Sequence, residues 1–173
     1  MPSSVYEGIV MDVEMTYDDR EFALEKTYER NRRKREAGVK DQKFDSTRGT
    51  LLIDYMGLLG ERAVAKTLGI PVQQFNGLEG DEGYDLIWHG LKLQIRYTFH
   101  NRGHLIVNCT GNPEQIEPDI YILTIGSESR ITILGYATRD HIRAVGTVKN
   151  FGYGNRFVLE QRELTDFAKL LKL

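Results

Sequence analysis

Hydrophobic positions along the chain recur with two different spacings, one typical of helices and one typical of strands. Between residues 51 and 68 apolar side chains return every three or four positions, and Gly69 and Pro71 follow directly. This spacing predicts a helix with one buried face, which ends at the glycine and the proline. A second helix is expected over residues 18–37, where Phe22, Leu24, Tyr28 and Ala37 form a thin apolar stripe. So thin a stripe suits an arm or a dimer element rather than a core helix.

Two segments with strand spacing flank a turn signal. Residues 84–88 and 91–98 alternate between apolar and polar side chains, and His89-Gly90 separates them. A two-residue connection that ends in glycine is typical of a β-hairpin. Further strands are expected at Leu105–Cys109, Ile120–Ile125, Arg130–Leu134 and Phe157–Leu159, and further helices from Thr138 to Val145 and over about 163–172. The order of a helix, several strands and a helix predicts an α/β or α+β fold with a mixed sheet.

Composition limits the class of protein without indicating a function. The 173 residues are 40% hydrophobic and 28% charged, which is ordinary for a soluble globular protein. No apolar run approaches the ~20 residues of a membrane helix, and the first residues lack the basic and apolar parts of a signal peptide. Cys109 is the only cysteine, so the chain cannot form an internal disulfide. We therefore expect a cytoplasmic protein with no membrane partner.

Charge is distributed unevenly along a chain whose net charge is only −2. Residues 1–19 contain five acidic side chains and no basic one, whereas basic side chains gather between residues 30 and 43. A local cationic stretch can bind phosphates even when the whole protein is acidic. The candidate DNA-binding residues are Arg30, Arg32, Arg33, Lys34 and Arg35, with Lys92 added from the hairpin. Glu25, Glu29 and Glu36 allow the alternative of a solvated helix with internal salt bridges.

The hairpin carries a polar face that could bind a cation. If His89 and Gly90 form the turn, Leu86 faces Leu93 and Asp85 faces Gln94, because side chains alternate along each strand. One face is then apolar, and the other holds Asp85, Lys92, Gln94 and Arg96, with Ile87 among them. Directly opposed residues have Cβ atoms ~5 Å apart. The Asp85 and Gln94 oxygens could therefore share one hard cation, with Arg96 next along the strand.

A glutamate lies on the apolar side of the helix expected at 51–68. The residues three and four positions from Glu61 are Gly57, Leu58, Val64 and Ala65, so its carboxylate faces inward. Arg62 and Lys66 are expected on the solvated side. A buried carboxylate needs a partner, and a metal ion or another cation is the usual one. Small residues at Gly57, Ala63 and Ala65 would let this helix lie close to the sheet.

The two elements provide side chains that suit phosphodiester hydrolysis. One or two Mg²⁺ ions activate water and neutralise developing charge, and a fixed cation beside them stabilises the pentacovalent state. Glu61, Asp85, Gln94 and Arg96 together form a candidate metal-dependent DNA-cleaving site.

These segments resemble the PD-(D/E)XK superfamily of restriction-endonuclease-like nucleases, and are similar to its small members from phages and bacteria. The resemblance rests on Gly57–Ala65, Gly80–Leu86 and Lys92–Thr98, and it covers roughly residues 50–137. It implies a mixed β-sheet flanked by helices in a nuclease-like domain over 50–173, preceded by an acidic segment and a basic helical arm over 1–49. It also implies that DNA is the substrate and that Mg²⁺ or Mn²⁺ binds to Asp85, Gln94 and the Ile95 carbonyl, with Glu61 in support.

Two positions depart from the family pattern. Gln94 stands where the family has an acid, which removes a negative charge from the metal site. Arg96 replaces the usual lysine, and an arginine stays protonated and cannot act as a base, although Lys92 two positions away could supply an ammonium group. The leading prediction is a Mg²⁺-dependent endonuclease or structure-selective DNA nuclease. The alternatives are a catalytically silent nuclease-fold module that binds DNA or a protein, and an interaction protein whose basic helix docks on an acidic partner. A homodimer would suit the cutting of two strands.

Overall fold

The computed structural model describes residues 8–38, 49–71, 83–107, 112–152 and 154–173. The helices are α1 (Tyr17–Ala37), α2 (Thr50–Leu68), α3 (Arg139–Val145) and α4 (Phe167–Leu170), with 3₁₀ turns at Pro113–Gln115 and Gln161–Glu163. The strands are β1 (Met11–Glu14), β2 (Leu86–Trp88), β3 (Leu91–Tyr97), β4 (Leu105–Val107), β5 (Ile120–Gly126), β6 (Arg130–Thr138), β7 (Thr147–Asn150) and β8 (Asn155–Leu159). Residues 39–48 and 72–82, which include Gly80 of the resemblance, and the end of the strand expected at Leu105–Cys109 lie outside the described residues.

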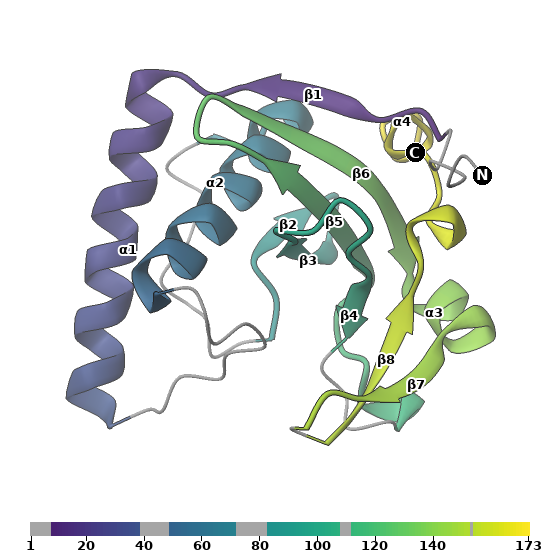
Figure 1. The fold of residues 1–173 in the computed structure, drawn as a ribbon. Coiled ribbons are helices and arrows are strands. Elements are labelled where there is room, and N and C mark those ends of the chain that lie inside the picture. Colours follow the sequence, from purple (N-terminus) through teal and green to yellow (C-terminus); the bar gives the residue numbers. More distant parts are fainter. Residues whose placement is uncertain (1–7, 39–48, 72–82, 108–111, 153) are drawn as a thin grey trace, which may run out of the picture.

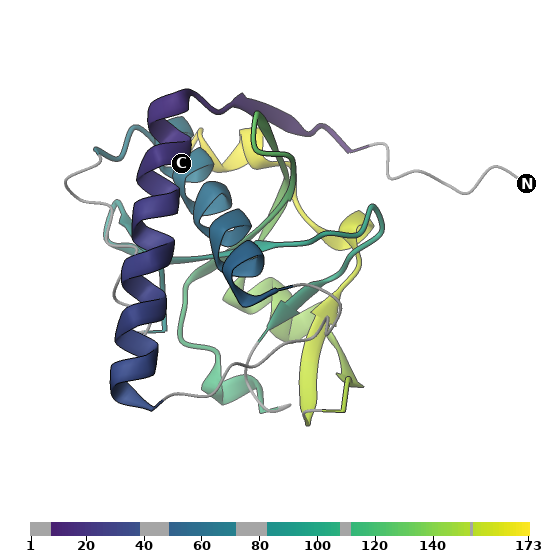
Figure 2. The same ribbon diagram turned by 60° about the vertical axis from the view of Figure 1, so that its left-hand side comes forward.

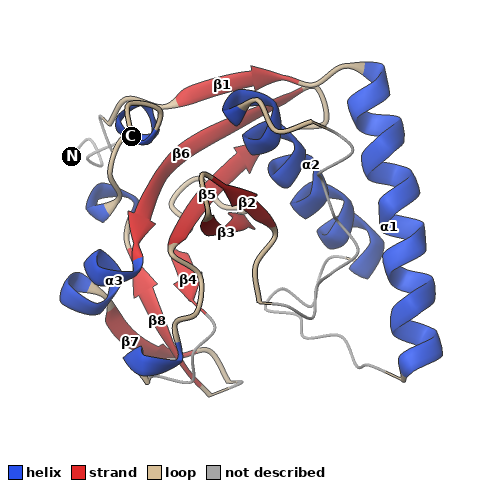
Figure 3. Cartoon of the chain, turned by 180° about the vertical axis from the view of Figure 1, so that it is seen from behind, coloured by secondary structure: helices blue, strands red, loops and turns tan. Residues whose placement is uncertain are grey.

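The strands form a curled five-stranded sheet in the order β1-β6-β5-β3-β2 and a three-stranded sheet in the order β4-β8-β7. In the larger sheet β3 and β5 are parallel and the other neighbours are antiparallel, so the predicted α/β fold with a mixed sheet is confirmed. α2 packs against this sheet and α1 packs on the outer side of α2 (Figures 1 and 2). The smaller sheet lies beside α3, at the end of the molecule away from α1 (Figure 3). Among the described residues, no helix has the length and apolar character to span a membrane.

The central strand β5 is buried on both faces and separates two cores. Ile120 and Ile122 belong to the core beneath α2, whereas Tyr121 and Leu123 belong to the core shared with the smaller sheet. This alternation follows from the period of two along a strand. The apolar run of β5 therefore carries no polar face, as is usual for a strand covered on both sides.

The hairpin has the predicted register. Leu86 pairs with Leu93 and Trp88 with Leu91. His89 and Gly90 have φ values of 49° and 77°, as a two-residue turn with both central residues in the left-handed region requires. Leu86, Trp88, Leu93 and Ile95 are buried, and Ile87 on the opposite face is 53% exposed.

The contact between α2 and the sheet depends on a glycine other than the expected one. A Cβ atom on Gly60 would lie 2.5 Å from Thr124 Oγ1 in β5, whereas a Cβ on Gly57 would meet nothing within 4 Å. The close approach was expected at Gly57, and that expectation was wrong. Ala63 and Ala65 are fully buried, as expected. Gly60 therefore fixes how deeply the following residue, Glu61, enters the space between helix and sheet.

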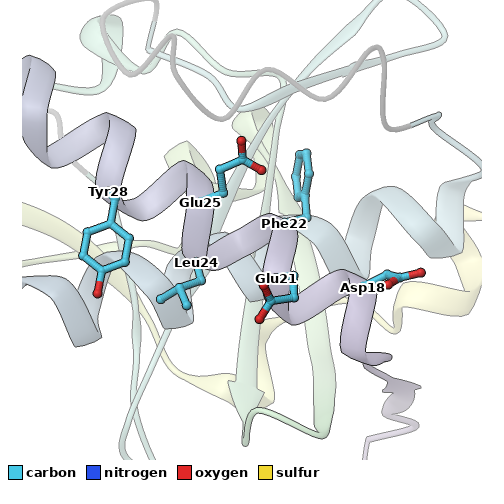
Figure 4. A pocket seen from close by; sticks show the side chains of 6 residues that line it. All are labelled: Asp18, Glu21, Phe22, Leu24, Glu25 and Tyr28. Carbon is cyan, nitrogen blue, oxygen red and sulfur yellow. The ribbon is translucent and has the colours of Figure 1, made fainter.

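The face of α1 that packs on α2 is polar and small rather than apolar. Its buried residues are Asp19, Ala23 and Thr27, which follow one another at four-residue spacing. Of the expected stripe, Leu24 and Tyr28 face outward and are 39% and 57% exposed, whereas Phe22 is half-buried and packs against the core. With Asp18, Glu21, Phe22 and Glu25, Leu24 and Tyr28 line a shallow pocket on the outer side of the helix, and these two project to the same side (Figure 4).

Several short elements differ from the sequence-based expectations. β1 and β7 were not expected, and the C-terminal helix comprises only Phe167–Leu170. β1 pairs with β6 at the edge of the larger sheet. The described part of residues 1–49 thus supplies an edge strand to the sheet that carries the hairpin, and a helix that covers α2.

Candidate functional site

The four predicted site residues lie on three segments of the chain. Glu61 comes from α2, Asp85 immediately precedes β2, and Gln94 and Arg96 lie on β3. Gln94 Nε2 donates a hydrogen bond of 2.8 Å to Asp85 Oδ2. Asp85 and Gln94 are therefore cross-strand neighbours, as the pairing of the hairpin predicts.

The Asp85 carboxylate is fixed by two donors and by its own backbone. Besides Gln94, the Ile95 amide donates to Oδ2 at 2.7 Å, and the Asp85 amide donates to the Leu93 carbonyl at 2.8 Å. The N–H and C=O groups of one strand residue point to the same side. The Ile95 carbonyl consequently faces the side of the strand on which Asp85 lies.

Glu61 is a buried acid with an incomplete set of partners. Its side chain is 6% exposed, and its Oε1 lies 3.6 Å from Arg30 Nη2. Its Oε2 is buried and accepts no hydrogen bond from any described residue. Burial raises the pKa of Glu61 well above the usual range, and the charge of Asp85 raises it further, while Arg30 and Arg96 oppose the shift.

The two acids respond to the same pair of cations. Burial raises the pKa of Asp85, and the hydrogen bond from Ile95 and the charges of Arg96 and Arg30 counteract it. The Nε atom of Arg96 is buried and has no hydrogen-bond partner within the described part of the chain. Glu61, Asp85, Arg30 and Arg96 thus form one electrostatic cluster, whose formal charge is zero when both acids are ionised.

Sequence reasoning placed Arg30 among the DNA-binding residues, but its guanidinium turns inward toward Glu61 and its side chain is only 18% exposed. The spacing of residues along the helix could have revealed this inward direction. Arg30 follows Asp19, Ala23 and Thr27 at spacings of four, four and three, so all four share one helix face. That face packs on α2.

The other basic residues proposed for DNA binding fall into two groups. Lys34 pairs with Asp54 at 3.2 Å, and Lys92 pairs with Glu117 at 3.4 Å and lies over the Tyr84 ring. Arg32, Arg33 and Arg35 are exposed on α1, and Arg32 lies 4.0 Å from Glu36. The exposed residues are the ones whose charge faces solvent, where a phosphate could reach it.

Arg62 and Lys66 do not lie on a solvated side of α2, contrary to expectation. Arg62 Nε donates to Asp19 Oδ1 at 3.0 Å, and Lys66 Nζ donates to Asp19 Oδ2 at 2.7 Å. Both side chains therefore attach α2 to the first turn of α1.

The oxygen donors of the site suit a hard cation. They are the Glu61 and Asp85 carboxylates, the Gln94 amide and the Ile95 carbonyl, all of which are ligand types that Mg²⁺ and Mn²⁺ accept. The described residues contain no group of three or more His, Cys, Asp or Glu side chains arranged to hold a metal ion. A metal ion here would therefore depend on the amide and the carbonyl as well as on the two acids.

Comparison of the chain with protein-family models, with curated proteins and with solved structures finds no match. The α/β fold and the chemistry of the four side chains are accordingly the observations from which a function can be inferred.

Proposed function

We propose that the protein is a metal-dependent deoxyribonuclease with a restriction-endonuclease-like core, which hydrolyses phosphodiester bonds at the site of Glu61, Asp85, Gln94 and Arg96. One observation carries the proposal: Glu61 of α2 is buried with an oxygen that no described residue satisfies. The second acid, Asp85, is held in place by a hairpin amide and a backbone amide, and its charge raises the pKa of Glu61. Buried acids whose pKa values are raised are common at catalytic sites.

The site suits a divalent cation because one oxygen of Glu61 lacks a partner among the described residues. Its buried Oε2 has no donor among the described residues, and a second negative charge raises the pKa of its carboxyl group. A divalent cation bound at this site would relieve both the desolvation of the two acids and their mutual repulsion. Asp85, Gln94 and the Ile95 carbonyl would hold it, with Glu61 in support. When bound, such an ion supplies positive charge at the phosphate and lowers the pKa of coordinated water.

The remaining residues of the site contribute orientation and fixed charge. Gln94 and the Ile95 amide orient Asp85 through hydrogen bonds of 2.8 and 2.7 Å. Arg96 can hold a phosphate while negative charge builds on it, and it cannot accept a proton because its guanidinium stays charged. Arg32, Arg33 and Arg35 are exposed on α1 and offer contacts to the DNA backbone.

Cleavage of DNA tests this function directly. Supercoiled plasmid and branched DNA are incubated with Mg²⁺ or Mn²⁺, and with EDTA as the metal-free control. Wild type should nick the DNA only when the metal ion is present. Asp85→Asn should cleave at least about a hundredfold more slowly, the scale of removing one essential group at a site. Asp140→Asn is the matched control, because Asp140 is 95% exposed on α3 and its loss should leave cleavage unchanged. Equal cleavage by the two variants would contradict the proposed site.

A second candidate is a nuclease-fold module that binds DNA or a protein without cutting. The observation that favours it is the balance of charge: Arg30 and Arg96 act on both acids, so the four charges of the ionised site cancel without a metal ion. Gln94→Glu with Arg96→Lys restores the acid and the lysine of the family pattern. Cleavage by this double variant but not by wild type, with DNA bound by both, would favour the silent module.

A further inference from the structure

Arg30 reaches the candidate site from α1, which lies outside the segments that resemble a nuclease. Its Nη2 is 3.6 Å from Glu61 Oε1. This separation is longer than the ~2.7–2.9 Å of a strong charge-assisted hydrogen bond. Arg30 therefore compensates the charge of Glu61 without satisfying it, and the second oxygen of Glu61 still lacks a donor among the described residues.

Contacts on both sides of Arg30 hold α1 against α2. Toward the start of α1, Asp19 accepts hydrogen bonds from Arg62 and Lys66. Toward its end, Asn31 and Lys34 bind Asp54 of α2, with distances of 3.0 and 3.2 Å to its Oδ2. The guanidinium is thus brought to Glu61 by the docking of a whole helix, which makes a chance surface contact a poor explanation.

We propose that Arg30 is a resident counter-ion of the site and competes with a divalent cation for Glu61. The inference deepens the proposed nuclease function and rests on it, because it concerns the cation which that function requires. Two cations close to one carboxylate repel each other, and this repulsion is strong where water is excluded. The identity of residue 30 therefore sets how tightly the site binds a divalent cation.

Calorimetric titration of Mn²⁺ into metal-free protein tests the competition. Arg30→Gln should bind Mn²⁺ at least about ten times more tightly than wild type, because one opposing charge is removed. Lys26→Gln is the matched control. It removes the same charge one helical turn earlier, where Lys26 is 22% exposed and pairs with Glu29 at 3.3 Å. Its Mn²⁺ affinity should equal that of wild type.

Thermal unfolding gives a second measurement that needs no DNA. A ligand that binds only the folded protein raises its melting temperature, and at a fixed ligand concentration tighter binding gives a larger rise. Mn²⁺ should therefore raise the melting temperature of Arg30→Gln more than that of wild type, both relative to EDTA. If Arg30→Gln folds poorly, Arg30→Lys keeps the charge on a shorter and more mobile group, and its affinity should lie between those of wild type and a neutral residue.

The outcomes separate this inference from the function on which it rests. Binding of Mn²⁺ by wild type, with equal or weaker binding by Arg30→Gln, overturns the competition and leaves the nuclease proposal standing. Tighter binding by Arg30→Gln without DNA cleavage by any variant supports the competition and overturns the nuclease. Failure of both wild type and Arg30→Gln to bind Mn²⁺ overturns both.

Discussion

Asp19 and Glu61 are two buried acids at the boundary between α1 and α2, and their surroundings are opposite. Asp19 is 4% and Glu61 5% exposed. Asp19 accepts hydrogen bonds from Arg62, Lys66 and the Thr16 amide at 3.0, 2.7 and 2.9 Å. Glu61 has one looser ion pair with Arg30, and a buried oxygen without a donor among the described residues.

The pKa values of the two acids shift in opposite directions as a result. Burial opposes the ionisation of Asp19, but the hydrogen bonds from Lys66 and Thr16 outweigh it and lower the pKa of Asp19. For Glu61 burial and the charge of Asp85 prevail and raise its pKa. A buried acid with complete partners attaches one helix to another. One with incomplete partners costs stability, and such a cost is typical of a group kept for binding or chemistry.

Removal of the well-paired acid should have the largest effect on stability. Asp19→Ala leaves Arg62 and Lys66 without their shared carboxylate and removes an N-terminal contact of α1. Breaking such a buried pair from one side costs about 3 kcal/mol. For a chain of this size, that corresponds to a fall in melting temperature of roughly 6–12 °C, measurable by calorimetry or circular dichroism.

The neighbouring residue provides the control. Asp18 lies in the same first turn of α1 but is exposed, so Asp18→Ala should cost less than about 1 kcal/mol through the helix dipole alone. Equal losses in the two variants would mean that the pairing of Asp19 with α2 contributes little.

A smaller loss of stability is expected at Gly60, which sets the position of Glu61. Gly60→Ala puts a methyl group 2.5 Å from Thr124 Oγ1, and relief of that contact must move α2 or rotate Thr124. Overpacking of this kind costs about 1–3 kcal/mol. Gly57→Ala is the matched control, since its Cβ meets nothing within 4 Å, and alanine there should stabilise the helix by ~0.5–1 kcal/mol. Denaturant unfolding of both variants measures the difference, and stabilisation by both would show that the helix–sheet contact is not tight at Gly60.

The parts of the molecule that the sequence predicted are those governed by local rules. The register of the hairpin follows from the His89-Gly90 turn, because a two-residue connection fixes every pair beyond it. That register alone brings Asp85 opposite Gln94. The inward direction of Glu61 follows from its apolar neighbours at three and four positions. Neither inference needs knowledge of distant parts of the chain.

The errors concern contacts that carry no hydrophobic signal. α1 docks through Asp19, Ala23 and Thr27, whose polarity and small size conceal a buried face. Without that buried face in view, Arg62 and Lys66 were expected on the solvated side of α2, and Arg30 was expected to bind DNA. β7 is exposed at all four positions, so it shows no alternation, and β1 is a strand of only four residues. Tertiary pairing rather than local pattern makes these segments regular.

The smallest expected change in stability is a gain, and it concerns Glu61, the poorly paired acid. Glu61→Gln keeps the shape of the side chain and removes the buried charge, so it should stabilise the metal-free protein at neutral pH. A rise in melting temperature of roughly 2–4 °C, equivalent to about 1 kcal/mol, is the expected scale for a chain of this size. The measurement is thermal unfolding in EDTA from pH 7 down to about pH 3.

The dependence on pH distinguishes the two acids. The folded-state pKa of Glu61 lies above its unfolded value of 4.5, so its ionisation destabilises the fold above pH 4.5 and has no effect well below it. The gain from Glu61→Gln should therefore shrink as the pH falls through 4.5. The pKa of Asp19 lies below its unfolded value of 3.8, so its stabilising effect is present above pH 3.8 and is lost as the pH falls through the folded-state pKa.

A Glu61→Gln protein that is less stable than wild type at neutral pH would mean that the Arg30 pair stabilises the fold on balance. Glu61 would then be a second anchor between the helices, and the strongest support for a metal site would be lost.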